Sequence, residues 1–529
     1  MTLYQTLSKW ADEQPDRPAY RYFGDCRSYG SLRKSVDITS GKLVTLGVKA
    51  GDRVGLCLVN SPQMLHLLYA LNRIGAVAVM ISPKASKREL REQLTLTECR
   101  LLFCTELSAA AANSLDNVTV IKVPLFADLP IRFKLGCAGR IVKHGRLKRA
   151  VSLGSIAVSE NIPPVSANDD ADAAIIFSSG TSGECKAVVH TNKSMIASAI
   201  YCMQSEQPLP GDADMYAILP CYHAYGLIVS VNTPIMVGCC CRLMPFFHIS
   251  TIVSQLRQKM PTFIPAVPTV FKRLVDNKRF CRLIDSGRLD TSRFRTGFVG
   301  GDVLPEGVKQ AFDRLMRAGG GTGVLCPGYG MSECCPITVE RDVSFDGSVG
   351  LPFDNNEVMV CGEGDDTPLP DGASGEICVH SAGMMSRAFT ADKTFTPTVF
   401  ADGKMWLRTG DIGHMNNGRL YFERRMRRLI KVSGHTVFAD AVEKVVGECD
   451  GVGKVIAVPV PHATRGSGVY LYFTGDADSR DVLDYCRREL MPYAVPVGIS
   501  HIDQSDIPLT ELGKIAYGVL EKAAAQNAG

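Results

Sequence analysis

The sequence predicts an α/β protein, with a large N-terminal domain of layered β-sheets and helices and a small α+β domain after it. Three observations predict this fold class: a strand–helix–strand pattern in residues 54–81, a second strand-to-glycine-turn pattern in residues 296–330, and a change of texture near residue 408. At 529 residues the chain is long enough for two or more domains and a large core.

The first pattern begins with a β-rich run, Val54–Val59. Ser61 and Pro62 follow as an N-cap and a proline at the first helical position. Apolar residues then recur at helical spacing until Gly75, which ends the helix and leads into a further strand, Ala76–Ile81. A βαβ unit of this kind implies a parallel sheet with helices on its faces.

The second pattern places a strand at Thr296–Val299 directly before Gly300-Gly301. We expect a helix starting at Pro305, a strand at Val324–Cys326 and a turn at Gly328–Gly330. Glycine-rich turns after strands are where open α/β sheets bind their ligands. This part of the chain is therefore a candidate binding region.

The pattern of expected helices and strands changes in the last quarter of the chain. Asn417-Gly418 lies between two short apolar runs, which is a strong β-hairpin signal. Beyond it, about a hundred residues of short mixed elements are sized for a small α+β domain. We place the boundary near Arg427, which gives domains of residues 1–426 and 427–529.

Composition and charge exclude several classes of protein. Hydrophobic residues make up 46% and charged residues 21%, which argues against disorder. The net charge of +4 is too small to imply nucleic-acid binding. The 19 cysteines include no Cys-x-x-Cys pair, and residues 1–20 have no signal-peptide pattern, so we expect free thiols and a cytoplasmic protein.

Two segments raise the question of membrane contact. Leu227–Met244 is largely apolar, but polar residues, proline and glycine interrupt it, so we predict a buried helix and strand there instead of a membrane span. Residues 129–159 carry seven lysines and arginines and no acidic residue. A solvated basic face or loop explains this segment, and attraction to an anionic membrane surface or an acidic partner is the alternative. Membrane contact is thus at most peripheral.

The loop Ser178–Lys186 reads Ser-Ser-Gly-Thr-Ser-Gly-Glu-Cys-Lys and follows an apolar run, Ala173–Phe177. Its glycines let the backbone approach a ligand closely, its hydroxyl and N–H groups donate hydrogen bonds, and Lys186 adds a positive charge. The spacing differs from that of a Walker A motif at the last position. The loop therefore indicates phosphate binding, and a flexible polar surface loop is the alternative.

Seven motifs that carry glycines, hydroxyls and charges occur in one order along the chain. They are Ser178–Lys186, Leu219–Gly226, Gly300-Gly301, Tyr329–Glu333, Thr409–Asp411, Arg425 with Ile430–Gly434, and Pro508–Lys514. This order resembles the adenylate-forming enzyme superfamily, which comprises acyl-CoA synthetases, stand-alone adenylation domains and luciferases. The resemblance extends over nearly the whole chain.

The resemblance implies a two-step reaction that uses ATP and Mg²⁺. A carboxylate attacks the α-phosphate of ATP and gives an acyl-adenylate and pyrophosphate. A thiol, either of coenzyme A or of the phosphopantetheine on a carrier protein, then displaces AMP. Attack by an anion on a polyanion needs cations that offset the repulsion, which suits the charged residues of the motifs.

The resemblance also implies roles for individual residues. Lys514 would bridge the substrate carboxylate and the α-phosphate, and Glu333 would bind Mg²⁺ as a hard oxygen ligand. His223 would border the acyl pocket. Lys431 lies in a loop that would face the site during thioester formation, after the small domain has rotated about a hinge near Arg427.

The remaining residues would bind the nucleotide. Tyr329 would stack on adenine, and Asp411 and Arg425 would contact the ribose. The other predicted contacts are loop and turn residues: Ser178, Ser179, Gly180, Thr181, Ser182, Gly183, Lys186, Gly300, Gly301, Gly330 and Ser332.

The pocket motif, which reads His-Ala-Tyr-Gly from His223, limits the classes of acid expected as substrate. Amino acid adenylation domains have Phe-Asp at the start of this region, so an amino acid substrate is disfavoured. A medium- or long-chain fatty acid or an aryl acid remains, with an apolar lining expected from Leu227, Val299 and Met331. The chain departs from the family at Cys185, where proline is usual, which suggests that adenylation is sensitive to thiol alkylation.

Two other functions stay open. The chain could load an acyl group onto an acyl carrier protein, which the basic segment 129–159 would suit. It could also be a catalytically degenerate adenylation fold that serves as a binding module. The presence of Lys186, Glu333, Asp411 and Lys514 weighs against the second alternative.

Overall fold

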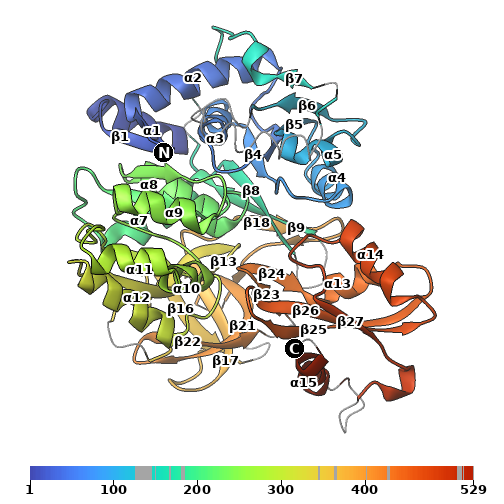
Figure 1. Cartoon of the computed structure of the whole chain (residues 1–529). Coiled ribbons are helices and arrows are strands. Elements are labelled where there is room, and N and C mark those ends of the chain that lie inside the picture. The colour runs from blue at the N-terminus through green and yellow to red at the C-terminus, as the bar shows by residue number, and fades with distance from the viewer. Residues whose placement is uncertain are drawn as a thin grey trace. The chain divides into compact units, whose positions relative to one another are not determined.

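The computed structural model covers the chain in two units (Figure 1). It describes all residues except 125–145, 149, 166–167, 180–184, 343–345, 363–365, 401, 426–428, 509–514, 516 and 528–529. The first unit comprises Met1–Pro83, Leu90–Phe177 and Ala187–Arg424, and the second comprises Lys84–Glu89, Ser178–Lys186 and Arg425–Gly529. The basic segment 129–159 lies mostly outside the described residues.

The largest sheet of the described residues has the strand order β19-β18-β9-β8-β4-β3-β5-β6-β7. Its strands are β3 (Arg53–Cys57), β4 (Val77–Met80), β5 (Leu101–Cys104), β6 (Thr119–Lys122), β7 (Val151–Ser152), β8 (Asp172–Ser179), β9 (Cys185–Thr191), β18 (Arg387–Phe389) and β19 (Thr394–Phe395). The strands from β8 to β7 pair in parallel, and β18 pairs antiparallel with β9 and β19.

Three further sheets of the first unit have the orders β10-β11-β1-β2, β12-β13-β14-β15 and β16-β17-β21-β20, with β22 paired to β21. Their strands are β1 (Pro18–Tyr22), β2 (Asp25–Ser28), β10 (Asp214–Ala217), β11 (Cys240–Leu243), β12 (Thr296–Val299), β13 (Val324–Met331), β14 (Cys334–Val339), β15 (Leu351–Pro352), β16 (Asn356–Cys361), β17 (Gly375–Ser381), β20 (Thr398–Val399), β21 (Met405–Asn416) and β22 (Arg419–Arg425).

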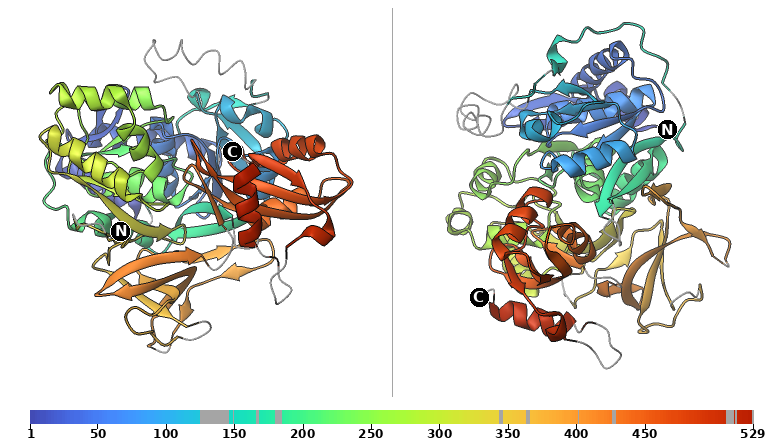
Figure 2. Two further views of the ribbon diagram at one scale, coloured as in Figure 1. Left: turned by 60° about the horizontal axis from the view of Figure 1, so that its bottom comes forward. Right: turned by 90° about the vertical axis from the view of Figure 1, so that its right-hand side faces the viewer.

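The helices before residue 320 pack on these sheets and on one another. They are α1 (Leu3–Glu13), α2 (Tyr29–Thr45), α3 (Pro62–Ile74), α4 (Lys87–Leu96), α5 (Ala109–Ala112), α7 (Asn192–Gln204), α8 (Thr233–Met236), α9 (Ile249–Gln258), α10 (Pro268–Val275), α11 (Lys278–Asp285) and α12 (Glu306–Ala318), with a π-helix, η3, at Tyr225–Asn232. Helices α9 to α12 lie against one another (Figures 1 and 2).

The predicted βαβ unit is confirmed. Strands β3 and β4 pair in parallel, with Arg53 opposite Val77. Between them, the Ser61 side chain accepts a hydrogen bond from the backbone N–H of Met64, and Gly75 ends α3 at φ 86°. A side chain with a β-carbon rarely adopts that left-handed conformation, so glycine suits this helix end.

The turn predicted at Gly328–Gly330 is wrong. These residues belong to β13, which continues to Met331 and pairs antiparallel with β14. A β-carbon at Gly328 would lie 2.6 Å from the backbone oxygen of Thr338, so this glycine permits a close approach between two strands and makes no turn.

The hairpin at Asn417-Gly418 is confirmed between β21 and β22, with positive φ at both residues.

The apolar stretch from Leu227 forms a buried helix and strand, as predicted. It is made of η3, α8 and β11, and nearly all of these side chains are buried. None of the helices among the described residues is long and apolar enough to cross a membrane.

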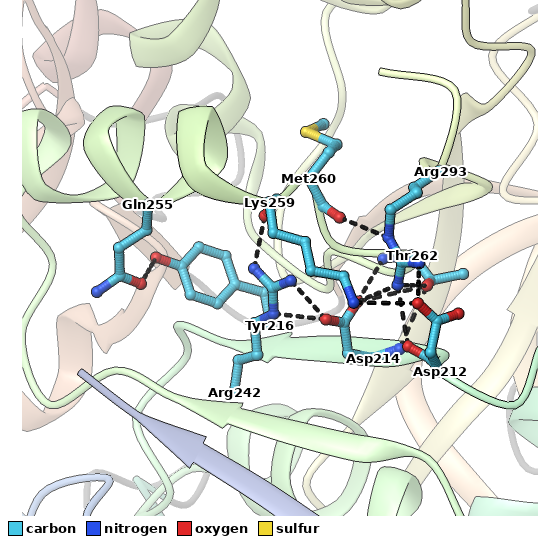
Figure 3. Close-up of polar contacts among 9 residues, drawn as sticks. All are labelled: Asp212, Asp214, Tyr216, Arg242, Gln255, Lys259, Met260, Thr262 and Arg293. Atoms are coloured by element: carbon cyan, nitrogen blue, oxygen red, sulfur yellow. Dashed lines mark hydrogen bonds and ion pairs between the residues drawn. The ribbon is translucent and has the colours of Figure 1, made fainter. Parts of the chain in front are cut away.

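A cluster of charged and polar side chains fixes β10 in the first unit (Figure 3). Asp214, 1% exposed, is 2.6 Å from Nε of Arg242 on β11 and 3.4 Å from Nη2 of Arg293. One oxygen of the same carboxylate also accepts the backbone N–H of Thr262 at 2.9 Å. Buried charge is tolerated when it is paired and hydrogen-bonded, so these contacts hold β10 in place. The chain continues from β10 into the Leu219–Gly226 motif.

The second unit contains a sheet of order β24-β23-β26-β25, with β27 paired to β26. Its described elements are β23 (Leu429–Val432), β24 (His435–Phe438), α13 (Ala439–Val446), β25 (Val452–His462), β26 (Gly466–Gly475), α14 (Ser479–Glu489), β27 (Gly498–His501) and α15 (Tyr517–Asn527). Alternate side chains of β25 and β26 pack with α13 and α14 on one face of the sheet and with α15 on the other. The mixture of helices and strands in this region agrees with the predicted small α+β domain. The predicted boundary near Arg427 falls outside the described residues.

Candidate active site

The predicted phosphate loop joins β8 to β9. Ser178 lies at the end of β8, and Cys185 and Lys186 open β9, each with a half-buried side chain. Because β8 is parallel to β4, the loop leaves the carboxyl end of a parallel strand, where open sheets bind ligands. The predicted contacts Gly180, Thr181, Ser182 and Gly183 lie outside the described residues, as does the side chain of Ser179.

Two residues predicted to bind the nucleoside are in direct contact. The Tyr329 hydroxyl on β13 donates a hydrogen bond of 2.7 Å to Oδ2 of Asp411 on β21, although 82 positions separate the two residues. Both side chains are buried. One face of the Tyr329 ring stacks on Phe422, with ring centroids 6.1 Å apart. The structure therefore brings the predicted adenine and ribose residues together.

The Thr-Gly-Asp segment is shaped by its own backbone bonds. The Thr409 hydroxyl donates to the backbone oxygen of Ile377 at 2.8 Å and accepts the N–H of Asp411 at 3.1 Å. Gly410, at φ 68°, donates its N–H to Glu376. The register between β17 and β21 is irregular at this segment, and Asp411 is fully buried.

Glu333, the predicted Mg²⁺ ligand, lies in the tight turn Ser332-Glu333 between β13 and β14. Turn residues are usually exposed, but Glu333 is only 7% exposed. Its backbone oxygen accepts the N–H of Met385 at 2.7 Å. Gly330, beside this turn, has backbone atoms of β14 within 3.6 Å of its β-carbon position.

The donor chemistry at Glu333 fits Mg²⁺. A carboxylate is a hard oxygen ligand, and Mg²⁺ is usually bound by one or two carboxylates together with substrate phosphates and water. Among the described residues, no group of three or more His, Cys, Asp and Glu side chains could hold a metal ion. Magnesium ions bound in this way share their remaining coordination positions between substrate phosphate and water.

The Leu219–Gly226 motif is fixed by a residue that the sequence did not reveal, Asn60. Its buried amide donates to the backbone oxygens of Ala217 and Leu219 at 3.0 and 2.8 Å, and its Oδ1 accepts the N–H of Cys221. Asn60 follows β3, a strand of the large parallel sheet, so its place at a carboxyl-end loop was the signal that could have found it. The hydrogen bonds of Asn60 connect the loop after β3 to the loop after β10.

His223 stands at the entry to η3, and its ring is half-buried, 4.9 Å from that of Tyr222. The π-helix is rare and is frequent at functional sites. A β-carbon at Gly226 would lie 1.9 Å from the backbone oxygen of Pro220, so only glycine fits at this position.

Tyr225 links the same motif to Gly300-Gly301. Its hydroxyl donates to the backbone oxygen of Phe298 at 2.8 Å, and its ring lies 3.2 Å from the β-carbon position of Gly300. Burial raises the pKa of Tyr225 well above its ordinary value, so the hydroxyl stays protonated and acts as a donor. Gly301 has φ 81°, which favours glycine.

The three residues expected to line the acyl pocket pack in three different apolar clusters. Leu227 belongs to the core around α1, α2 and α3, Val299 to the core around α10 and α12, and Met331 borders the core around β17. The identity of the pocket lining therefore stays a prediction.

The second unit holds the other predicted residues. The Lys431 ammonium on β23 donates to the Thr436 hydroxyl at 2.7 Å. The rings of His435 and Tyr493 stack at 4.2 Å, and burial, together with Lys84 and Lys431, lowers the pKa of His435 to about 4. Lys514 and the side chain of Arg425 lie outside the described residues, so their predicted roles stay predictions.

Comparisons with known proteins identify the family. The family described as "AMP-binding enzyme" matches residues 7–387, and the family described as "AMP-binding enzyme C-terminal domain" matches residues 441–514. The chain therefore belongs to the AMP-binding enzyme family, which confirms the predicted adenylate-forming class. Within this class it is an AMP-forming acid–thiol ligase of the acyl-CoA synthetase type, as predicted.

Individual relatives are distant but cover nearly the whole chain. A long-chain-fatty-acid–CoA ligase of Bacillus subtilis (strain 168) is 24% identical, over 99% of this chain and 95% of its own length. A 4-coumarate–CoA ligase of Humulus lupulus is 25% identical, over 92% of this chain and 87% of its own. The structure of an amide bond synthetase from Marinactinospora thermotolerans is similar with a TM-score of 0.81, at 22% identity over 99% of both chains. This likeness confirms the predicted fold class.

Proposed function

We propose that this enzyme activates an apolar carboxylic acid with ATP and transfers the acyl group to coenzyme A. The acid is a medium- or long-chain fatty acid or an aryl acid. The observation that carries the proposal is the contact between Tyr329 and Asp411 in a chain of the AMP-binding family, because it gathers the residues expected to hold adenosine. The two kinds of acid are those named for the relatives from Bacillus subtilis and Humulus lupulus.

In the proposed first half-reaction, the acid's carboxylate attacks the α-phosphate, the bond to the β-phosphate breaks, and pyrophosphate leaves. Tyr329 and Asp411 orient the adenosine, and the loop from Ser178 to Lys186 binds the outgoing phosphates. Glu333 would hold Mg²⁺, which offsets phosphate charge when bound. Lys514 would supply the positive charge next to the reacting oxygen.

In the proposed second half-reaction, the coenzyme A thiol attacks the acyl carbonyl and AMP leaves. The segment from Lys431 to His435 would line the thiol's approach, as the resemblance implies. Arg425 would contact the ribose throughout. His223, at the entry to η3, would border the acid.

The proposal is tested by carboxylate-dependent exchange of label between pyrophosphate and ATP, measured over fatty and aryl acids of graded length. We expect exchange with at least one of these acids and AMP release on addition of coenzyme A. AMP release only with a holo-acyl carrier protein would replace coenzyme A by the carrier as the acceptor. The absence of exchange with every acid would overturn the proposal in favour of a binding module.

A lysine variant tests the site assignment within this assay. Lys514→Ala should lose exchange by at least about a hundredfold, because a charge at the reacting phosphate is removed. Lys522→Ala, which changes an exposed lysine of α15, is the matched control and should retain parental exchange. Exchange that survives intact in Lys514→Ala would show that another residue supplies the charge.

A further inference from the structure

A histidine that the predicted mechanism does not use is buried beside the Ser332-Glu333 turn. His190 lies on β9, after three fully buried apolar residues, Ala187–Val189, and is itself 0% exposed. A polar ring buried to this extent is destabilising unless its nitrogens are hydrogen-bonded. The contacts of both nitrogens therefore decide what the residue does.

Both ring nitrogens of His190 have partners. Nε2 lies 2.8 Å from the backbone oxygen of Ser332, and Nδ1 lies 3.4 Å from the Ser194 hydroxyl. Because a carbonyl oxygen only accepts hydrogen bonds, Nε2 carries the proton and donates it to Ser332. Burial lowers the pKa of His190, which keeps the ring neutral and preserves this arrangement.

The hydrogen bond from His190 orients the peptide group that joins Ser332 to Glu333. The carbonyl of Ser332 and the N–H of Glu333 belong to one planar unit, so fixing the oxygen also fixes the start of Glu333. On its other side, Glu333 is held by the N–H of Met385, and the next residue, Ser386, donates its own N–H to Val189 of β9. Strand β9 and the segment that pairs with it thus hold both ends of Glu333.

We propose that His190 is a positioning residue that orients the Glu333 carboxylate towards Mg²⁺ through the Ser332 peptide group. The inference rests on the proposed function, since it takes Glu333 as the Mg²⁺ ligand. Groups that orient a metal ligand typically change metal affinity about 10- to 100-fold when they are removed.

The test compares ATP binding by calorimetry with Mg²⁺ and with a chelator in its place, and so needs no turnover. In the parent, Mg²⁺ should tighten ATP binding. His190→Leu should reduce this gain about tenfold or more and leave binding without Mg²⁺ unchanged. His190→Gln, whose amide can also donate to the Ser332 oxygen, should recover most of the gain.

Two controls separate positioning from a general loss of stability. Val188→Ala truncates a fully buried neighbour on the same strand, so it should lower the thermal midpoint and keep the parental Mg²⁺ gain. In a double-mutant cycle, His190→Leu should add nothing once Glu333→Gln has removed the carboxylate, because both changes act on one ligand.

The outcomes distinguish this inference from the proposed function. A parent that binds no ATP would overturn both. A parent with a clear Mg²⁺ gain that His190→Leu retains, or a cycle in which the two effects add, would overturn the role of His190 and leave the proposed function standing.

Discussion

The polar cluster around Asp214 and the Glu333 turn of the candidate active site are both buried in the first unit, but different bonds hold them. In the cluster, Asp214 is bound to the guanidinium groups of Arg242 and Arg293 (Figure 3). In the site, the turn that carries Glu333 is held through its backbone, by the imidazole of His190 and the amide of Met385. Both of these donors are neutral.

The difference indicates what each region can do. When opposite charges pair inside the protein, their charge is used to join elements of the fold. When neutral donors bind the backbone of a turn, they fix the turn through bonds that do not involve the side chain that it carries. Breaking the first arrangement should lower stability, whereas the second arrangement suits binding of a cation or a nucleotide. Changes in the two regions should therefore affect different measurements.

The largest effect on stability is expected from Arg242→Leu. Removing Arg242 leaves the buried Asp214 carboxylate with only its longer contact to Arg293 and the Thr262 N–H, which should lower the free energy of unfolding by up to about 3–5 kcal/mol. Chemical denaturation measures this loss. ATP binding by the protein that remains folded should change less than about twofold. A loss below about 1 kcal/mol would show that Asp214 does not depend on this partner.

Asp411→Asn should weaken ATP binding and change stability little, which is the reverse of the effect expected for Arg242→Leu. The side chain keeps its size, so the thermal midpoint should stay within a few degrees of the parent, but the charged acceptor expected to bind the ribose is lost. A hydrogen bond to a charged group contributes about 1.5–3 kcal/mol, which predicts ATP binding weaker by about 10- to 100-fold. Calorimetric titration with ATP measures it. Unchanged affinity would exclude Asp411 from the nucleotide site.

How much could be predicted from the sequence depends on how far apart the interacting residues lie. The helix from Pro62 to Ile74 and the hairpin at Asn417-Gly418 are determined by caps, spacing and turn residues close together in the chain, and these predictions are confirmed. The turn at Gly328–Gly330 was wrong, because only the pairing with β14 explains glycine at position 328.

The site could be predicted only in part, for the same reason. The contact between Tyr329 and Asp411 spans 82 positions, so spacing did not reveal it, and the two residues were found through the family resemblance. His190 and Asn60 were missed. A single histidine in an apolar strand and a single asparagine after one both look like ordinary buried residues until their partners, Ser332 and Cys221, are known.

Two tyrosine hydroxyls, one in the site and one beside the cluster, allow the two regions to be compared by removal of a single hydrogen-bond donor. The Tyr329 hydroxyl binds Asp411 in the site, and the Tyr216 hydroxyl binds Gln255 at 2.6 Å beside the cluster. Tyr329→Phe should weaken ATP binding about fivefold because Asp411 loses its donor, whereas Tyr216→Phe should lower stability by about 1 kcal/mol without changing ATP binding. Equal effects of both variants on ATP affinity would contradict the assignment.

The smallest expected effect is the dependence of stability on pH at Asp212, at the exposed edge of the cluster. Its carboxylate lies 3.0 Å from the Lys259 ammonium, which, together with Arg293, lowers the pKa of Asp212 below its ordinary value. The unfolded chain should titrate near the ordinary value of about 3.9, so it binds a proton before the folded protein does. The contribution of this carboxylate is therefore present above about pH 4 and is lost as the pH falls through the lower, folded pKa.

Asp212→Asn should reveal this loss as a change in slope. Because Asp212 is more than half exposed, solvent screens the interaction, and the variant should be less stable at pH 7 by under about 1 kcal/mol. Towards pH 3 the difference should shrink, since the parent carboxylate is then partly protonated in the unfolded chain. Urea denaturation at the two pH values measures both differences. A difference of the same size at pH 7 and pH 3 would mean that the side chain acts through its shape, and that the charge of Asp212 does not contribute to the cluster.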